Sequence, residues 1–242
     1  MFKVAALIPA RSGSKGIKDK NLTKIGGKTL LEWSINACKR CDSIGEIIIS
    51  TDSEKYAEHA SEMGGFVPFL RPKNISNDNS TDYEFFEHYL NWACENSSLP
   101  DLIAHIRPTT PFRDPKILEK AIRYYKDNEK KLTSIRSVHA MSESAYKTFE
   151  INNEGLLTTI FNHDSELDSS NNARQKFPLT YVANGYVDLI STEFTLKSKK
   201  IHGNKVLPFL TPTSYELDTI EDLDLLEFQL MKNSEIFAKV FY

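Results

Sequence analysis

The sequence predicts an α/β protein built around a mostly parallel sheet. Short apolar runs alternate with segments of helical periodicity up to about residue 139, a pattern typical of strand–helix–strand units with right-handed crossovers. Several of these runs are apolar throughout instead of alternating, which indicates strands buried on both faces of the sheet. At 242 residues, the chain is long enough for one such domain with a sizeable insertion.

Prolines mark the end of the first expected strand and the start of one expected helix. Val4–Ile8 is an apolar run, and Pro9 ends its ladder because proline has no N–H to donate. Asp114 before Pro115 is a favoured N-cap and first helical residue. The other expected elements are helices over Leu30–Lys39, after Ser53, over Tyr83–Glu95 and after Thr219, and strands over Glu46–Thr51, Gly65–Val67, Asp101–Ile106 and Thr133–Val138.

The pattern changes after residue 139. Helical periodicity fades, and short runs of β-branched and aromatic residues are separated by Asn, Ser and Gly clusters. Tyr146–Ile151 and Gly155–Phe161 are predicted to form a hairpin over Asn152–Glu154. The expected organisation is a core of residues 1–139 and 186–242 with an inserted, partly β subdomain of residues 140–185.

Composition excludes several classes of protein. The net charge of −3 gives no electrostatic reason to expect a nucleic-acid partner. No apolar segment approaches the ~20 residues of a membrane span, and Met1–Lys3 has no signal-peptide layout, so a cytoplasmic protein is expected. Cys38 and Cys41 form a C-x-x-C on an expected helix, but no second Cys or His pair stands at ligand spacing, which favours packing over zinc or redox chemistry.

A basic, glycine-containing loop follows the first strand. Ile8–Asn21 reads IPARSGSKGIKDKN. Glycines allow backbone N–H groups to turn toward one anion, and the cations add charge-assisted hydrogen bonds to phosphate. A solvated basic turn is the alternative, but the order of residues directly after a buried strand favours a phosphate-binding loop. The Gly-Lys-Ser/Thr ending of a Walker loop and the G-x-G-x-x-G of a dinucleotide fold are both absent.

This loop resembles the signature of the cytidylyltransferases that activate nine-carbon acidic sugars. These are the CMP-sialic acid synthetases, or acylneuraminate cytidylyltransferases, with their legionaminate and pseudaminate relatives; the CMP-Kdo synthetases have Arg-Leu in place of Lys15–Ile17. The resemblance implies a Rossmann-like three-layer nucleotidyltransferase fold with an inserted dimerisation subdomain that reaches over the partner's sugar site. It further implies CTP and a sugar acid as substrates, Mg²⁺ as cofactor and a homodimer.

The resemblance also implies where the nucleotide binds. Arg11, Lys15 and Lys20 would act as catalytic groups that hold the triphosphate and stabilise the leaving pyrophosphate. A second polar loop carries Leu-Arg-Pro and a Ser- and Asp-rich segment, where Arg71 and Ser80 match positions that contact cytosine. Asp82 falls where a related enzyme has a small hydroxyl, which makes it a further candidate contact. The predicted nucleotide-binding residues are Ala10, Arg11, Ser12, Gly13, Lys20, Asn21, Arg71 and Ser80.

The sugar-binding positions include two departures from the family pattern. Arg107–Arg113 reads RPTTPFR where the family has Q-P-T-S-P-L-R, and the family's glutamine reaches the sugar acid. An arginine can bind a carboxylate through its fork. Val182 replaces an arginine of the sialate enzymes. A sugar acid other than common sialic acid, or a carboxylate held by Arg107, would account for both. The predicted substrate-binding residues are Arg107, Thr109, Lys147, Arg174, Gln175 and Asn184.

Two carboxylates near the C-terminus are predicted to hold the metal. They follow Val206–Leu210, which Pro208 marks as an edge strand. Glu216 and Asp218 are two residues apart on an extended segment, so both point to one side, where they can share Mg²⁺ with phosphates. The family has D-x-D before a threonine at this place. The alternative is that both are acids that complement a helix dipole.

Three other functions fit parts of the sequence. A nucleotidyltransferase for another base or sugar, including a Kdo-type acid or a sugar-1-phosphate, would keep the basic loop, and a panel of nucleotides separates it. A glycosyltransferase would place its D-x-D mid-chain and would not need the N-terminal loop. A non-catalytic nucleotide-binding module would bind CTP and release no pyrophosphate.

Overall fold

A six-stranded sheet forms the centre of the computed structural model, which describes residues 2–160 and 167–242. The strand order is β10-β6-β9-β5-β1-β4, and β9 is the one strand that runs antiparallel to its neighbours. The predicted α/β class with a mostly parallel sheet is therefore confirmed. The strands are β1 (Val4–Pro9), β4 (Glu46–Ser50), β5 (Leu102–His105), β6 (Ser134–Ala140), β9 (Tyr181–Ser191) and β10 (Val206–Leu210).

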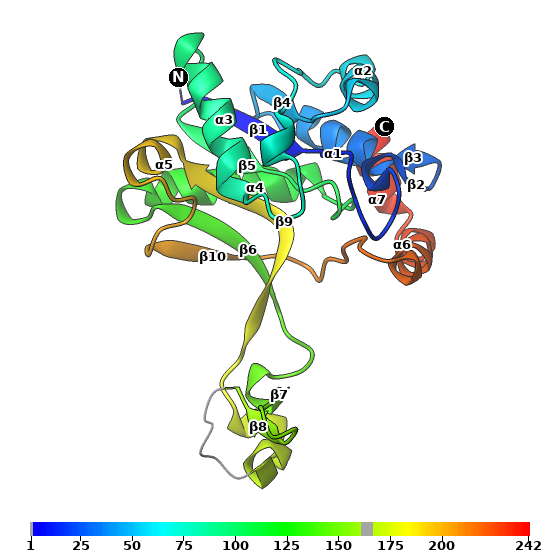
Figure 1. The fold of residues 1–242 in the computed structure, drawn as a ribbon, viewed down its shortest axis with the longest axis vertical. Coiled ribbons are helices and arrows are strands. Elements are labelled where there is room, and N and C mark those ends of the chain that lie inside the picture. The colour runs from blue at the N-terminus through cyan, green and yellow to red at the C-terminus, as the bar shows by residue number, and fades with distance from the viewer. Residues whose placement is uncertain (1, 161–166) are drawn as a thin grey trace.

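Helices cover both faces of this sheet and give it three layers (Figure 1). The larger core joins one face to α1, α2, α4, α6 and α7, and the smaller core joins the other face to α3. Short hairpin strands, β2 (Lys24–Ile25) and β3 (Lys28–Thr29), precede α1. The helices are α1 (Leu30–Lys39), α2 (Glu54–Glu62), α3 (Asp82–Glu95), α4 (Pro115–Asn128), α5 (Thr192–Ser198), α6 (Ile220–Lys232) and α7 (Glu235–Phe241).

Three predicted helix starts are confirmed, and each is capped by hydrogen bonds. Ser53 accepts from the N–H of Tyr56, and Asp114 accepts from that of Lys116 before Pro115. Thr219 and Asp222 form a capping box at the start of α6. The strand expected over Gly65–Val67 is wrong, because only an isolated bridge from Phe66 to Ile48 forms there. The side chain of Phe66 is 51% exposed, so little packing supports a longer pairing.

A narrow extension leaves the core where β6 and β9 continue beyond the sheet (Figure 1). Their pairing reaches Ala140 and Tyr181, and at its far end β7 (Phe149–Ile151) pairs with β8 (Leu157–Thr159). The predicted hairpin is confirmed but is shorter, because Ala145–Lys147 forms a 3₁₀ turn. The end of its expected second strand, Phe161, lies outside the described residues. We call residues 141–180 the arm.

β9 passes continuously from this extension into the core. Its first residues, including Tyr181 and Val182, are exposed, whereas Asn184–Ile190 are buried in the sheet. The strand therefore spans the position between residues 185 and 186 at which the sequence divides insert from core. Among the described residues, no helix is both long and apolar enough to cross a membrane.

Trp33 on α1 fixes the C-terminal helices to the core. It is fully buried, its indole N–H donates to the carbonyl of Ile25 at 3.0 Å, and its ring meets the edges of Phe112, Phe237 and Phe241 at centroid distances of 5.0, 5.5 and 4.8 Å. Phe237 and Phe241 belong to α7, which follows α6 and the carboxylate segment. Packing at Trp33 therefore helps to position Asp218.

Trp33→Ala should lower the free energy of unfolding by about 3–5 kcal/mol, because it removes a large buried ring and leaves a cavity. Urea denaturation followed by circular dichroism measures this loss. Trp92→Ala is a matched control at a partly exposed position on α3 and should cost less. Equal losses for the two variants would contradict the structural role given to Trp33.

Candidate active site

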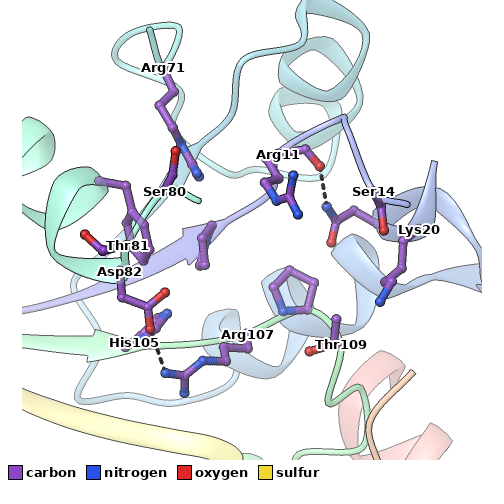
Figure 2. Close-up of a pocket in the computed structure, with 14 residues that line it drawn as sticks. Arg11, Ser14, Lys20, Arg71, Ser80, Thr81, Asp82, His105, Arg107 and Thr109 are labelled. Carbon is purple, nitrogen blue, oxygen red and sulfur yellow. Dashed lines mark hydrogen bonds and ion pairs between the residues drawn. The ribbon is translucent and has the colours of Figure 1, made fainter. Parts of the chain in front are cut away.

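A polar cavity of about 250 Å³ opens at the carboxyl ends of β1 and β5. This edge of an open α/β sheet is the usual place for ligands. Three loops line it: the basic loop after β1, the segment that leads into α3, and the turn after β5 (Figure 2). The lining residues are Pro9, Arg11, Ser14, Lys20, Asn21, Arg71, Ser80, Thr81, Asp82, Phe85, His105, Arg107, Pro108 and Thr109.

Internal hydrogen bonds hold the basic loop in shape. The carboxylate of Asp52, just after β4, accepts from both the N–H and the hydroxyl of Ser12 at 2.8 Å. Asn21 donates to the carbonyl of Arg11 at 3.1 Å, and Arg11 donates to that of Gly13 at 2.9 Å. Ala10 is fully buried, and its N–H donates to the carbonyl of Ser50. Ala10 and Ser12 thus anchor the loop, whereas Arg11 and Asn21 face the cavity.

The cations of this loop are paired with acids. Asp78 accepts from Arg11 at 2.8 Å and from Lys15 at 2.7 Å, and these two hydrogen bonds lower the pKa of its carboxyl. Lys20 pairs with Asp218 at 2.8 Å. The Lys15 side chain is 83% exposed. A polyanionic ligand in the cavity would meet Arg11 and Lys20, with Lys15 beside them outside the lining, and the present partners of all three are exposed or partly exposed carboxylates.

The carboxylate segment lies between the basic loop and the turn after β5. A Cβ on Gly16 would stand 2.6 Å from the carbonyl oxygen of Asp218, so only glycine permits this approach. The N–H of Leu217 donates to the carbonyl of Thr109 at 2.8 Å. On either side of Leu217, Asp218 is exposed and Glu216 is partly buried. The predicted metal ligands thus stand at the edge of the cavity that Lys20 and Thr109 line.

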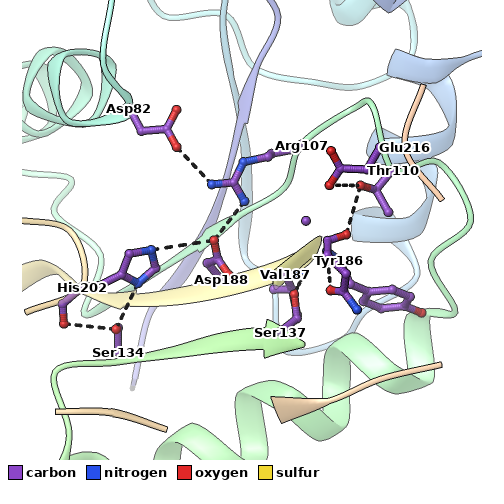
Figure 3. A network of polar contacts seen from close by, with 12 residues as sticks. Asp82, Arg107, Thr110, Ser134, Ser137, Tyr186, Val187, Asp188, His202 and Glu216 are labelled. Atoms are coloured by element: carbon purple, nitrogen blue, oxygen red, sulfur yellow. Dashed lines mark hydrogen bonds and ion pairs between the residues drawn. The ribbon is translucent and has the colours of Figure 1, made fainter. Parts of the chain in front are cut away.

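Glu216 is held against β9. Its Oε1 atom lies 3.4 Å from the hydroxyl of Thr110, and a Cβ on Gly185 would stand 2.4 Å from it (Figure 3). Gly185 also has φ of 63°, a left-handed conformation that favours glycine. Among the described residues, no group of three or more His, Cys, Asp or Glu side chains is arranged to hold a metal. Mg²⁺ at Glu216 and Asp218 would therefore need further oxygen ligands from phosphate and water.

Arg71 and Ser80 form the opposite wall (Figure 2). Arg71 is 5% exposed, donates to both the hydroxyl and the carbonyl of Ser50, and lies over the ring of Phe85 with 5.0 Å to its centroid. Burial lowers the pKa of its guanidinium to about 10, so the group remains charged at neutral pH. The hydroxyl of Ser80 accepts from the N–H of Asn77 at 3.0 Å.

Arg107 lies between two carboxylates (Figure 3). Its Nη1 atom is 2.9 Å from Asp188 on β9, and its Nη2 atom is 3.0 Å from Asp82 at the start of α3. Burial lowers the pKa of Arg107, but Asp188 and Asp82 raise it by more. Asp188 is 1% exposed, and His202 lies 3.9 Å from the same carboxylate oxygen.

His105 forms part of the cavity floor without a polar partner. It is fully buried, stands opposite Asp188 in the β5–β9 pairing, and packs against the rings of Phe85 and Phe86. Burial, and then the nearby charge of Arg107, holds the pKa of its imidazole well below the usual value, so the ring is neutral. Neither ring nitrogen has a hydrogen-bond partner within the part of the chain that is described.

Arg113 joins the turn after β5 to β9. It is fully buried and donates to the carbonyls of Arg107 (2.5 Å), Tyr186 (2.5 Å), Gly185 (2.9 Å) and Thr110. Burial lowers the pKa of its guanidinium to about 10.

The sequence did not identify three acids that bind residues of the basic loop and of the turn after β5. Asp52, Asp78 and Asp188 each bind a residue at least 40 positions away. The one local signal was that Asp52 directly follows a predicted strand. No sequence pattern links the other two acids to the cavity.

The predicted sugar-binding residues fall into two groups. Arg107 and Thr109 line the cavity, whereas Asn184 is buried beside it, where its amide donates to Thr211 at 2.6 Å and contacts His139 at 3.1 Å. Lys147, Arg174 and Gln175 belong to the arm and lie away from the cavity of their own chain (Figure 1). There, Lys147 lies 5.7 Å from the ring centroid of Phe177, and Arg174 donates to the carbonyl of Met141 at 3.0 Å.

The fold is shared with two solved enzymes. A CMP:2-keto-3-deoxy-manno-octonic acid synthetase complexed with CTP superposes with a TM-score of 0.70 over 96% of this chain and 99% of that one, at 14% identity. A 4-diphosphocytidyl-2C-methyl-D-erythritol synthase from Anaerococcus prevotii gives a TM-score of 0.62 over 95% and 96% of the two chains, also at 14% identity. These similarities confirm the predicted fold class.

Comparison with known sequences identifies the protein family. The N-acylneuraminate cytidylyltransferase of Escherichia coli O18:K1:H7 is 28% identical over 92% of this chain, which spans 50% of the length of that relative. The CMP-N,N'-diacetyllegionaminic acid synthase of Legionella pneumophila is 26% identical over 97% of this chain and 99% of its own length. The family model described as Cytidylyltransferase matches residues 5–236, which include every residue that lines the cavity. The chain therefore belongs to the cytidylyltransferase family.

Proposed function

We propose that this chain transfers CMP from CTP to a nine-carbon 2-keto-3-deoxy sugar acid, giving a CMP-sugar and pyrophosphate. The observation that carries the proposal is the arrangement of the cavity: Arg11 and Lys20 of the basic loop line it on one side, and Arg71 with Ser80 on another (Figure 2). The names of the relatives, which act on acylneuraminate or diacetyllegionaminic acid, favour this substrate class.

In the proposed reaction, the anomeric hydroxyl of the sugar attacks the α-phosphorus of CTP. A new P–O bond forms, the proton of the hydroxyl passes to water, the bond from the α-phosphorus to the oxygen it shares with the β-phosphate breaks, and pyrophosphate leaves. Arg11, Lys15 and Lys20 would exchange Asp78 and Asp218 for phosphate oxygens and stabilise the charge on the leaving group. Phosphoryl transfer requires mainly positioning and charge neutralisation, which this chain supplies from fixed loops.

Mg²⁺ fits the donor set of the carboxylate segment, because hard oxygen ligands from Asp218 and Glu216 can be completed by phosphates and water. When bound, the ion would neutralise phosphate charge and lower the pKa of the attacking hydroxyl. Asp218 now pairs with Lys20, so nucleotide binding would release this carboxylate as Lys20 turns to phosphate.

A homodimer would bring the arm to a cavity. The arm exposes large apolar side chains: Ile151 (72%), Leu156 (59%) and Leu179 (70%). Surfaces of this kind usually mark protein–protein contacts. Lys147, Arg174 and Gln175 lie too far along the arm to serve their own chain, and a partner chain would supply them to the sugar.

The proposed compartment is the cytoplasm, where CTP is available.

Lys15→Ala should lower turnover by roughly 100-fold or more, because it removes a preorganised cation from the leaving group. Pyrophosphate release from CTP, Mg²⁺ and a panel of sialic, legionaminic, pseudaminic and Kdo acids measures this change and identifies the sugar. Lys18→Ala is the matched control: both lysines are exposed cations of the same loop outside the cavity lining, but Lys15 shares Asp78 with the cavity-lining Arg11, whereas Lys18 does not. Near-full activity of Lys15→Ala would remove the role of the loop, and CTP binding without pyrophosphate would indicate a binding module.

Removal of the divalent cation should abolish turnover. EDTA should stop pyrophosphate release, excess Mg²⁺ should restore it, and Asp218→Asn should raise the Mg²⁺ concentration needed for half-maximal activity. Asp224→Asn, an acid within α6, is the control and should not change this concentration. Metal-independent synthesis would exclude the function given to Asp218 and Glu216.

Charges on the arm should separate the dimer. In sedimentation velocity, the Ile151→Asp/Leu179→Asp variant should run as a monomer and should lose turnover, because the arm no longer meets a partner. Met231→Asp changes an equally exposed apolar side chain on α6, 80% exposed, and should leave the dimer intact. A wild-type chain that is monomeric and fully active would refute this assembly.

A further inference from the structure

Asp82 presents an unused hydrogen-bond acceptor to the cavity. It is the first residue of α3, two positions after Ser80, and its side chain is 47% exposed. One carboxylate oxygen, Oδ2, binds Arg107 at 3.0 Å. Across the described ranges, 2–160 and 167–242, the other oxygen makes no hydrogen bond or ion pair with protein. Asp82 therefore offers a fixed acceptor beside the proposed cytosine wall.

Arg107 holds the carboxylate of Asp82 in place, and Arg107 is itself held by contacts with the sheet. Its Nη1 atom binds Asp188 at 2.9 Å, and Asp188 is anchored in the centre of β9 with 1% exposure. The backbone carbonyl of Arg107 is also held by the buried Arg113. Both ends of the guanidinium are thus occupied by carboxylates, and Asp82 cannot move without breaking a chain of contacts that reaches the sheet.

The net charge of Asp82, Arg107 and Asp188 together determines which ligand groups can bind beside Asp82. One guanidinium and two carboxylates carry a net negative charge, and His105 beneath them is neutral because it is buried without a partner. A sugar carboxylate or a phosphate at Asp82 would meet like charge, which costs free energy at close range. A neutral hydroxyl, in contrast, can donate to the free oxygen, and hydrogen bonds to charged acceptors are the stronger ones.

We propose that Asp82 is a specificity-determining residue that accepts a hydrogen bond from a ribose hydroxyl of the nucleotide, and that Arg107 is a positioning residue and not the receptor of the sugar carboxylate. This inference rests on the proposed function. A nucleotide with its base at Arg71 and Ser80 and its phosphates at Arg11 and Lys20 carries its ribose directly next to the base. The ribose hydroxyls are then neutral donors that lie between the wall formed by Arg71 and Ser80 and the cations that hold the phosphates.

Binding of CTP, 2′-deoxy-CTP and 3′-deoxy-CTP to the full chain, measured by calorimetry without sugar acid, tests the role of Asp82. The wild type should bind CTP at least 10-fold more tightly than one of the two deoxynucleotides, since a hydrogen bond to a charged group contributes about 1.5–3 kcal/mol. Asp82→Ala should reduce this preference to near unity by weakening CTP alone. Asp82→Asn, which keeps an acceptor oxygen, should retain part of it.

The preference also tests Arg107. Arg107→Gln should reduce the discrimination against the deoxynucleotide and leave the KM for the sugar acid within about twofold. If Arg107 instead binds the sugar carboxylate, the KM for the sugar acid rises by 10-fold or more while the nucleotide preference is kept, and the inference is overturned. Glu193→Ala breaks the exposed pair with Lys197 on α5 and should change neither quantity.

Two results separate this inference from the proposed function. Equal affinity of the wild type for CTP and both deoxynucleotides would overturn the role of Asp82 while the cytidylyltransferase activity stands. Absence of CTP binding by the wild type would overturn the proposed function and, with it, the inference.

Discussion

The buried guanidinium of Arg113 is the contact on which the rest of the site depends. A charge removed from water is tolerated only where hydrogen bonds replace its hydration, and Arg113 finds these at the carbonyls of the turn after β5 and of β9. Neutral carbonyl dipoles can satisfy the charge without a carboxylate. Arg113 thereby links the turn after β5 to β9 and fixes the backbone of both Arg107 and Gly185. Glu216 in turn packs directly on Gly185.

A second constraint is that the cavity is lined with charges of both signs. Arg11 and Lys20 in its lining, and Lys15 beside them, repel one another, and Asp78 and Asp218 offset that repulsion by pairing with them. These acids are exposed or partly exposed, so each pair contributes little stability and can be exchanged at little cost. Preorganised cations with replaceable partners suit a site that must take up and release polyanions in every turnover. Arg71 differs, because it is buried and bound to backbone, which suits recognition of a neutral base.

Local sequence patterns predicted the elements whose environment is uniform along their length. The apolar runs that became β1, β4 and β5 are buried over most of their length, and the helices with polar caps begin where the caps stand. β9 escaped prediction because it passes from an exposed ribbon into a buried antiparallel strand, so no single periodicity describes it. The basic loop was recognisable because its residues are contiguous. Its acidic partners were not, because Asp52, Asp78 and Asp218 reach it only through the fold.

The two most informative departures from the family pattern explain each other only in three dimensions. Considered singly, an arginine for a glutamine at residue 107 indicates a carboxylate receptor, and an acid for a small hydroxyl at residue 82 indicates little. In the structure Arg107 and Asp82 form an ion pair, and Arg107 also pairs with the buried Asp188. The positive charge of Arg107 is therefore already neutralised within the chain. With Val182 exposed on β9 instead of a second arginine, one chain then has little uncommitted positive charge for a sugar carboxylate in this part of the site. The cations proposed for that task lie on the arm, at Lys147 and Arg174, away from the cavity of their own chain, and the proposed homodimer would bring them to the cavity of a partner.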